Sequence, residues 1–219
     1  MALITELQVQ KRNTNRFNLF VDNKFYGGVS TKTVADNNLY KGKTLTEEEL
    51  DQLFGIELYN RLFDRAVNYL DKGMRSEFKL KSYIKELIFK KRGDWFAQEY
   101  QIDSEEVCSR IASRLTELGL INDLNYARFY VQERIRLKPR SRYAMISELL
   151  SKGISKEIAE QVCDELITDE YQLLKEAYYK KYKATPLTKD DSKKISFLQR
   201  KGFSWELISQ LIDEYDKGE

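Results

Sequence analysis

The tetrapeptide Lys-Gly-Ile-Ser at residues 152–155 returns as Lys-Gly-Phe-Ser at residues 201–204, roughly fifty residues further on. After each serine, apolar residues recur at matching positions, namely Ile158, Val162 and Leu166 in one copy and Leu207, Leu211 and Tyr215 in the other. This spacing forms one apolar stripe along a helix, the serine can cap the helix N-terminus, and the glycine suits the left-handed backbone at which helices often stop. Each copy is therefore predicted to contain a helix, a glycine stop and a capped helix.

A third copy of the pattern lies one period upstream, where Ser104 is the candidate N-cap of another apolar stripe. Further helical segments precede the three copies, at residues 59–70, 125–136 and 171–182. Because a fixed period means that one supersecondary unit is copied and stacked, these segments predict three tandem three-helix repeats. A single unit of this size buries too little surface to be stable alone, so we expect a mainly α, elongated array.

The N-terminal residues follow a different pattern. Apolar residues alternate along residues 16–21 and the turn-forming pair Asp-Asn follows at residues 22–23, which predicts a β-hairpin. Thr46 precedes three glutamates, which is typical of a helix start, and we expect a domain boundary near Gly55. The predicted domains are an N-terminal extension with a hairpin and a short helix at 1–56, then three-helix repeats at 57–120, 121–168 and 169–219.

The composition excludes several classes of protein. The 219 residues contain no histidine, which removes the commonest general base near neutral pH and the most frequent zinc ligand. Cys108 and Cys163 are too far apart for a CxxC motif, and we expect both to be buried as small apolar residues. No stretch is typical of a signal peptide or a membrane-spanning helix. We therefore expect a cytoplasmic protein that is not an enzyme and has no cofactor, metal, membrane contact or small-molecule substrate.

Three motifs, taken in order and with their spacing, carry a family resemblance. Residues 66–70 read Ala-Val-Asn-Tyr-Leu and are followed by Arg-Ser-Glu at 75–77, residues 115–131 contain a Leu-rich helix end and a Tyr-Ala pair, and residues 148–154 read Glu-Leu-Leu-Ser-Lys-Gly-Ile. Together they resemble the RecX family of regulatory proteins, from about residue 57 to the C-terminus. Residues 89–101 depart from the family pattern, because they form a longer link between the second and third helices of the first repeat.

The resemblance implies a fold of three-helix repeats and a non-enzymatic function in homologous recombination, DNA repair and the SOS response. Members of this family bind in the helical groove of the RecA–DNA filament, bridge neighbouring subunits and restrain filament assembly, ATP hydrolysis and strand exchange. The implied partners are the RecA filament and, weakly, single- or double-stranded DNA. The residues themselves leave an alternative open, a repressor-like or architectural protein whose three-helix units bind DNA directly.

Charge distribution supplies the candidate binding residues, since the formal net charge of +2 is too small to identify a nucleic-acid binder. The densest basic run joins two predicted helices and consists of Arg134, Arg136, Lys138, Arg140 and Arg142. Arginines here can bind phosphate or carboxylate groups bidentately, and a helix beginning near Pro139 would attract an anion by its dipole. The alternative is a solvated helix end, where cations are favoured in any case.

Other candidate cations lie near predicted helix ends, and they are Arg75, Lys152, Lys180, Lys181, Arg200 and Lys201. Ordinary helix surface is the favoured alternative for the cations at 180, 181, 200 and 201, whereas Arg75 either pairs with an acid or extends outwards. Ser76 is a candidate cap of the helix that follows it. Tyr126, Phe129 and Tyr130 could stack on bases, but their helical spacing favours packing in the core.

Overall fold

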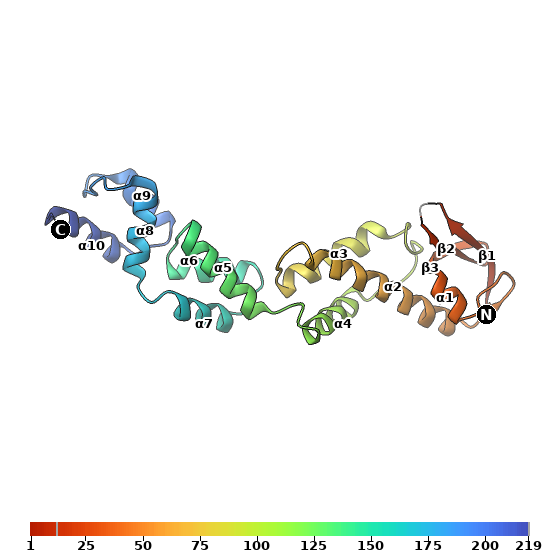
Figure 1. Cartoon of the computed structure of the whole chain (residues 1–219). Helices are drawn as coiled ribbons and strands as arrows, with labels where there is room; N and C mark the ends of the chain where they lie inside the picture. The colour runs from red at the N-terminus through yellow and green to blue at the C-terminus, as the bar shows by residue number, and fades with distance from the viewer. Residues whose placement is uncertain (12, 219) are drawn as a thin grey trace. The chain divides into compact units, whose positions relative to one another are not determined.

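The computed structural model describes residues 1–11 and 13–218, and it is mainly helical with a small sheet at the N-terminal end (Figure 1). The predicted fold class, mainly α with an N-terminal β region, is confirmed. The chain divides into two compact units, which are described separately. Unit 1 contains Met1–Met74 and Leu80–Ile121, and unit 2 contains Arg75–Lys79 and the chain from Asn122 onward. Each unit has its own hydrophobic core.

The sheet of unit 1 has four antiparallel strands, β1 (Ala2–Gln10), β2 (Asn13–Val21), β3 (Lys24–Ser30) and β4 (Thr44–Leu45), in the order β3-β2-β1-β4. The predicted hairpin is confirmed as β2 and β3. Its turn residues Asp22 and Asn23 have φ angles of 49° and 63°, the left-handed values of the tight turn that matches strand twist. The pairing of β2 with β1 makes the sheet larger than the hairpin expected from the sequence.

Two helices follow in unit 1, α1 (Thr31–Asp36) and α2 (Glu47–Leu70). Thr46 caps α2 as predicted, in a reciprocal capping box with Glu49. The segment at residues 59–70 is helical as predicted, but it is the second half of α2, which begins at Glu47 and continues through Gly55 without a break. A helical glycine costs only about 0.5–1 kcal/mol relative to alanine, and the buried stripe on either side, which includes Phe54 and Leu58, outweighs that cost.

Unit 1 is completed by most of α3 (Glu77–Lys91) and by α4 (Ser104–Glu117), which contacts α2. The N-cap of α4 is Asp103 and not Ser104, because the Asp103 carboxylate accepts from two first-turn amides and its charge favours the helix N-terminus. The long link between α3 and α4 adds to the sheet edge. The amide of Gly28 donates to the carbonyl of Trp95 at 2.9 Å, and that of Ala97 donates to Tyr26 at 2.9 Å.

Unit 2 consists mainly of six helices, α5 (Asp123–Leu137), α6 (Arg142–Ser151), α7 (Lys156–Leu166), α8 (Glu170–Tyr182), α9 (Ser192–Arg200) and α10 (Trp205–Asp216). Helices α5 and α6 both pack on α7, and α8 contacts α9 and α10. The helix expected near Pro139 is α6, which begins at Arg142. Pro139 lies buried before the cap, and the Ser141 hydroxyl, which caps the helix, accepts from the amide of Ala144. None of the helices in the described chain has the length and apolar character that a membrane crossing requires.

The repeated glycine turns have the predicted conformation. Gly153 and Gly202 have φ angles of 80° and 90°, and the serines that follow, Ser155 and Ser204, cap α7 and α10. Both glycines also lack room for a side chain, since a Cβ on Gly153 would collide with Phe78 and one on Gly202 with the Ser141 hydroxyl. Each turn therefore requires its glycine for two reasons, the left-handed backbone conformation and the close packing.

The turn at Gly153 is held by the residues that begin α3. The Ser76 hydroxyl donates to the carbonyl oxygen of Lys152 at 2.7 Å, and the Glu77 amide donates to the Asp123 carboxylate at 2.9 Å. Ser76 also accepts weakly from the Lys79 amide, at 3.4 Å, so its expected capping role is shared with docking.

The turn at Gly202 is held by the residues that begin α6, in the same arrangement. The Ser141 amide donates to the carbonyl oxygen of Lys201 at 3.0 Å, and the Arg142 amide donates to the Glu170 carboxylate at 2.9 Å. The sequence repeat thus corresponds to a repeated contact, in which the start of one helix docks on the Lys-Gly turn and on an acidic residue in the first turn of another helix.

Candidate functional site

The basic run that begins at Arg134 is organised by one carboxylate, that of Glu148 on α6. Arg134 Nε lies 2.9 Å from Glu148 Oε2, and Arg140 Nε lies 3.1 Å from Oε1. The Tyr130 hydroxyl donates to Glu148 at 2.7 Å and accepts from Arg134. Glu148 therefore holds two arginines in fixed positions, one in the last turn of α5 and one in the connection to α6. The sequence offered no signal for this role, because Glu148 was one of many acids on predicted helix surfaces.

Two lysines from the repeated glycine turns join the same group. Lys152 Nζ lies 4.9 Å from the centroid of the Tyr130 ring, and Lys201 Nζ donates to the carbonyl oxygen of Pro139 at 3.0 Å. Burial lowers the pKa of Lys201, and the charges of Arg140, Arg134 and Lys138 lower it further. We call Arg134, Lys138, Arg140, Lys152 and Lys201, together with Glu148, the Glu148 basic cluster.

Two members of the basic run are paired with other carboxylates. Arg136 is 65% exposed and binds Glu133 one helical turn away, with Nη2 at 2.7 Å from Oε2, and this bond raises its pKa. Arg142 Nη2 lies 2.6 Å from Asp164 Oδ1 on α7. The structure therefore brings three of the five predicted residues into the Glu148 basic cluster and places the other two in separate ion pairs.

The remaining candidate cations occupy varied positions in unit 2. Lys180 Nζ donates to the carbonyl oxygens of Ile135 and Arg136 at 3.2 and 2.5 Å, so it caps the C-terminal end of α5. Lys181 Nζ lies 4.1 Å from the centroid of the Phe197 ring. Arg75 is partly buried next to Ser76, and Arg200 is exposed at the end of α9. Lys180 and Lys181 therefore make contacts within the fold, whereas the side chain of Arg200 is exposed to solvent.

The aromatic residues of α5 divide by face. Tyr126 and Tyr130 are stacked with centroids 6.3 Å apart and pack against the core, as their spacing predicts. Phe129 is 51% exposed, so the expectation that it packs in the core is wrong. It lies on the side of α5 opposite the buried stripe of Ala127 and Val131.

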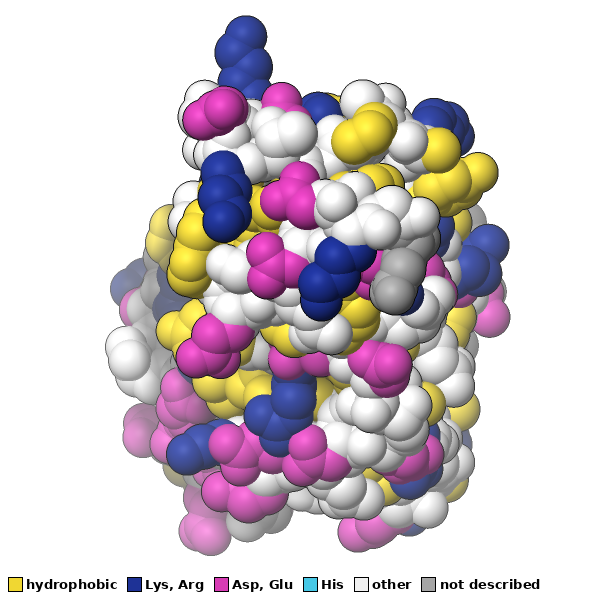
Figure 2. All heavy atoms as spheres, turned by 90° about the vertical axis from the view of Figure 1, so that its left-hand side faces the viewer, with side chains coloured by type: hydrophobic (Ala, Val, Ile, Leu, Met, Phe, Trp, Pro, Cys, Tyr) yellow, Lys and Arg dark blue, Asp and Glu magenta, His cyan; other side chains and the backbone are white. Residues whose placement is uncertain are grey.

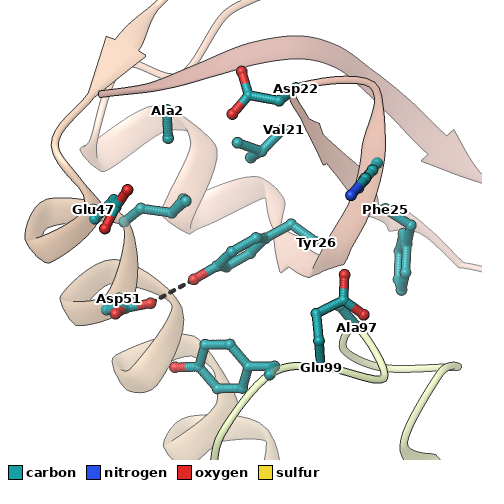
Figure 3. A pocket seen from close by; sticks show the side chains of 12 residues that line it. Ala2, Val21, Asp22, Phe25, Tyr26, Glu47, Asp51, Ala97 and Glu99 are labelled. Atoms are coloured by element: carbon teal, nitrogen blue, oxygen red, sulfur yellow. Dashed lines mark hydrogen bonds between the residues drawn. The ribbon is translucent and has the colours of Figure 1, made fainter.

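Unit 1 contains a cavity of about 380 Å³ between β3, the start of α2 and the link before α4 (Figure 3). In the close view Tyr26 extends from β3 toward α2, where its hydroxyl donates to Asp51 Oδ1 at 2.6 Å. Burial raises the pKa of Tyr26, and the hydrogen bond to Asp51 raises it further. The other carboxylates of the lining are those of Asp22, Glu47 and Glu99, with Lys24 also present. Such a lining is complementary to a cationic group.

Charges elsewhere are mixed. Figure 2 shows Lys and Arg side chains interspersed with Asp and Glu over the visible face, with no extended field of one sign. Within the part of the chain that the structure describes, no cluster of three or more His, Cys, Asp and Glu side chains is arranged to hold a metal ion.

Comparison with known proteins gives a consistent result. Residues 2–46 match the regulatory protein RecX N-terminal domain, and residues 122–162 match the second three-helix domain of RecX. Regulatory protein RecX of Listeria monocytogenes serovar 1/2a is 30% identical over 96% of this chain and 75% of its own length. The protein of the same name from Clostridioides difficile is 29% identical over 99% of this chain and 100% of its own length. For Listeria monocytogenes serotype 4a RecX the identity is 32%, and the match spans 58% of that relative's length.

Solved structures show the same fold. A crystal structure of regulatory protein RecX aligns with a TM-score of 0.62 at 23% identity, over 98% of this chain and 100% of the other. The crystal structure of RecX from Lactobacillus salivarius aligns with a TM-score of 0.52 at 26% identity, over 72% of this chain and 96% of the other.

Proposed function

The chain belongs to the RecX family of regulatory proteins, and on this premise we propose that it binds the filament that the RecA recombinase forms on DNA. Binding restrains filament assembly, ATP hydrolysis and strand exchange, in the cytoplasm, during homologous recombination and DNA repair. The protein acts as a binding partner and not as an enzyme, and its contact with DNA is weak.

The Glu148 basic cluster is the observation that carries this proposal for the present chain. The cluster combines five cations with one carboxylate; burial lowers the pKa of Lys201, and repulsion by Arg140, Arg134 and Lys138 lowers it further. An acidic surface or a phosphate that docks here relieves this repulsion, so docking gains free energy beyond the new contacts. Arg134 and Arg140 are held in place by Glu148, and fixed side chains lose less conformational entropy on binding.

The cluster also draws its members from α5, from the connection to α6 and from both repeated Lys-Gly turns. The turns are fixed by hydrogen bonds that their lysine carbonyl oxygens accept, from the Ser76 hydroxyl at one turn and from the Ser141 amide at the other. A surface assembled from several rigid elements keeps its charge pattern, which favours recognition of one partner over a general attraction to anions.

A charge-reversal experiment tests the proposal. We expect Lys138→Glu combined with Arg140→Gln to raise the concentration that inhibits the ATPase of RecA on single-stranded DNA by tenfold or more, which corresponds to about 1.4 kcal/mol. The matched control is Lys189→Glu combined with Lys193→Gln, which makes the same change in net charge at two exposed positions of unit 2. Circular dichroism should show unchanged helix content in both variants.

Two outcomes would contradict the proposal at different levels. Equal inhibition by the cluster variant and its control would remove the Glu148 basic cluster from the interface. A wild-type protein that changes neither the ATPase of RecA nor the length of its filaments would overturn the RecA partnership itself.

Direct DNA binding by the three-helix units is the second candidate function, and the excess of cations in the cluster favours it. Neutralisation of three to five phosphates predicts that log affinity for duplex DNA falls against log salt concentration with a slope of about −3 to −4.5. The assay contains no RecA. Tight binding with that slope, in the absence of any effect on RecA, would favour this second function.

A further inference from the structure

Unit 1 contains an arginine with a buried donor atom that has no hydrogen-bond partner among the described residues. Arg61 lies on α2 with its guanidinium carbon 3.7 Å from the centroid of the Trp95 ring, and Trp95 is only 4% exposed. The Arg61 Nη1 atom is buried and has no hydrogen-bond partner among the described residues. A buried, charged donor without an acceptor is costly, because it has lost its water and gained nothing in return. The ring contact compensates for only part of this loss.

Further cations surround the same tryptophan. The guanidinium carbon of Arg65 lies 5.7 Å and Lys91 Nζ 5.9 Å from the ring centroid. Burial lowers the pKa of Arg61 to about 9, and the charge of Arg16 contributes to that shift. The nearby acids are already paired, since Glu57 binds Arg16 at 2.8 Å and Asp94 binds Lys91 at 2.9 Å. Positive charge therefore exceeds negative charge around Trp95.

Space for a ligand lies beside Arg61. A cavity of about 470 Å³ adjoins this side chain, many times the roughly 30 Å³ that one water molecule occupies. Its polar lining includes Gln8, Gln10, Lys11, Asn18 and Asp94. Gly28 packs closely against this side of the cavity, because a Cβ at Gly28 would lie 3.4 Å from Arg61 Nη1 and 2.8 Å from Gln10 Nε2. Side-chain amides, a lysine and an arginine thus line one cavity, and the carboxylate in the same lining, that of Asp94, is paired with Lys91.

We propose that Arg61 and Lys11, which line this cavity, bind phosphate groups of a nucleic-acid strand, and that Arg65 and Lys91 add positive charge beside Trp95. An arginine fork matches a phosphate bidentately, and several cations near one ring suit a ligand that carries repeated anions better than a single carboxylate does. The Trp95 ring is covered, so it offers no platform for a base. Recognition through phosphates alone is independent of sequence. The assignment concerns unit 1 and does not depend on the proposed RecA partnership.

Tryptophan fluorescence tests the site directly, because Trp95 touches Arg61 and the chain has 2 tryptophans. The full-length protein with Trp205→Phe leaves Trp95 as the single reporter. This protein is titrated with inorganic phosphate, with an oligothymidylate and with polyglutamate of similar charge, in the absence of RecA. We expect a saturable change in Trp95 emission with the oligonucleotide, at least tenfold tighter per anion than with inorganic phosphate.

Arg61→Met keeps an apolar stem over Trp95 and removes the charge, so it should weaken oligonucleotide binding tenfold or more, while Arg61→Lys retains part of it. Arg110→Met is the matched control, because Arg110 also lies over a ring, 5.1 Å from the Tyr59 centroid, on another helix of unit 1. If Arg61→Met misfolds, the exposed Lys11 provides a second test. We expect Lys11→Ala to decrease the slope of log affinity against log salt concentration by about 0.7 in magnitude, because one phosphate contact is lost.

Three results would overturn the assignment. One is unchanged affinity in both Arg61→Met and Lys11→Ala. The second is saturation by inorganic phosphate without oligonucleotide binding, which would assign the cavity to a free phosphate. The third is equal affinity for polyglutamate, which would assign it to carboxylates of a protein partner.

Discussion

Glu57 on α2 is a carboxylate that the structure buries and then surrounds with donors. It is 4% exposed, binds Arg16 at 2.8 Å, and accepts from the hydroxyls of Ser30 and Thr33. Burial alone would raise its pKa, but the hydrogen bond from Thr33, the charge of Arg16 and the bonds from Ser30 together lower it. A single residue therefore links the sheet, α1 and α2 through one charge.

Removal of the Glu57 charge should strongly destabilise the fold. We expect Glu57→Gln to lower the free energy of unfolding by about 3–5 kcal/mol at pH 7, because Arg16 is left as an unpaired, largely buried cation. Urea denaturation measures the loss, and Glu48→Gln at an exposed position of the same helix is the control.

The pH dependence of stability follows from the lowered pKa. A carboxylate whose pKa is lower in the folded state stabilises the fold above its unfolded pKa of about 4.3, and this contribution disappears as pH falls through the folded value. The wild type should therefore lose more stability below pH 4.3 than Glu57→Gln does. Parallel curves of stability against pH for the two proteins would contradict this assignment.

The cysteines predict a clear difference between folded and unfolded protein. Both are fully buried, as expected from the sequence, and burial raises the pKa of Cys163 to about 11. The thiolate is the reactive form, so neither thiol should react with a disulfide reagent at pH 8 in the native protein, and both should react in urea. Rapid labelling of a thiol under native conditions would show that the core around it opens.

At the scale of elements, three glycines differ in backbone conformation and in the space around them, so their substitutions report separately on backbone strain and on packing. Gly55 lies inside α2 and Gly119 follows α4 with a φ of 70°, and a Cβ would have open space at both. Gly153 has a similar φ of 80° but also faces Phe78. Helix propensity, left-handed strain and a steric clash can therefore be measured in one protein.

We expect Gly55→Ala to stabilise the protein by about 0.5–1 kcal/mol, because alanine is the better helix former. Gly119→Ala should destabilise it by about 1–2 kcal/mol through left-handed strain alone. Gly153→Ala should cost more than Gly119→Ala, because Phe78 must also move, which adds about 1–3 kcal/mol. Urea midpoints measure the series, and any other order would contradict it.

The element boundaries also show where local rules compete. Asp103 replaced Ser104 as the cap of α4 because a carboxylate accepts from two amides, and α2 crossed Gly55 because its buried stripe continues on both sides. The sequence alone could not decide either boundary, because the free energies of the competing caps and of a helical glycine are similar, about 1 kcal/mol each.

At the scale of the whole molecule, two cores imply that unfolding is not a single transition. One cluster of buried residues contains Phe54, Leu62 and Trp95, and the other contains Met145, Leu174 and Tyr178. A chain with separate cores departs from two-state behaviour when one core is weakened. The three predicted repeats remain a prediction, because the division into two units does not follow their boundaries.

A two-probe experiment measures this. In a Trp205→Phe background, fluorescence reports on Trp95 in unit 1, whereas far-ultraviolet circular dichroism reports on the helices of both units. We expect Glu57→Gln to shift the fluorescence midpoint to lower urea by more than the circular dichroism midpoint. Coincident curves would mean that the two cores unfold as one.

The sequence by itself determined the features that depend on neighbouring residues: the helical stripes, the β-hairpin turn, the caps Thr46, Ser155 and Ser204, and the left-handed glycines 153 and 202. These are local because a cap or a stop satisfies groups within one helical turn. Only the tertiary structure decided that Glu148 binds Arg134 and Arg140, that Arg142 pairs with Asp164, and that Arg61 Nη1 has no hydrogen-bond partner among the described residues. The pairing of charges depends on which helix faces pack together, and that is decided by the burial of apolar surface across the whole chain, which no local spacing encodes.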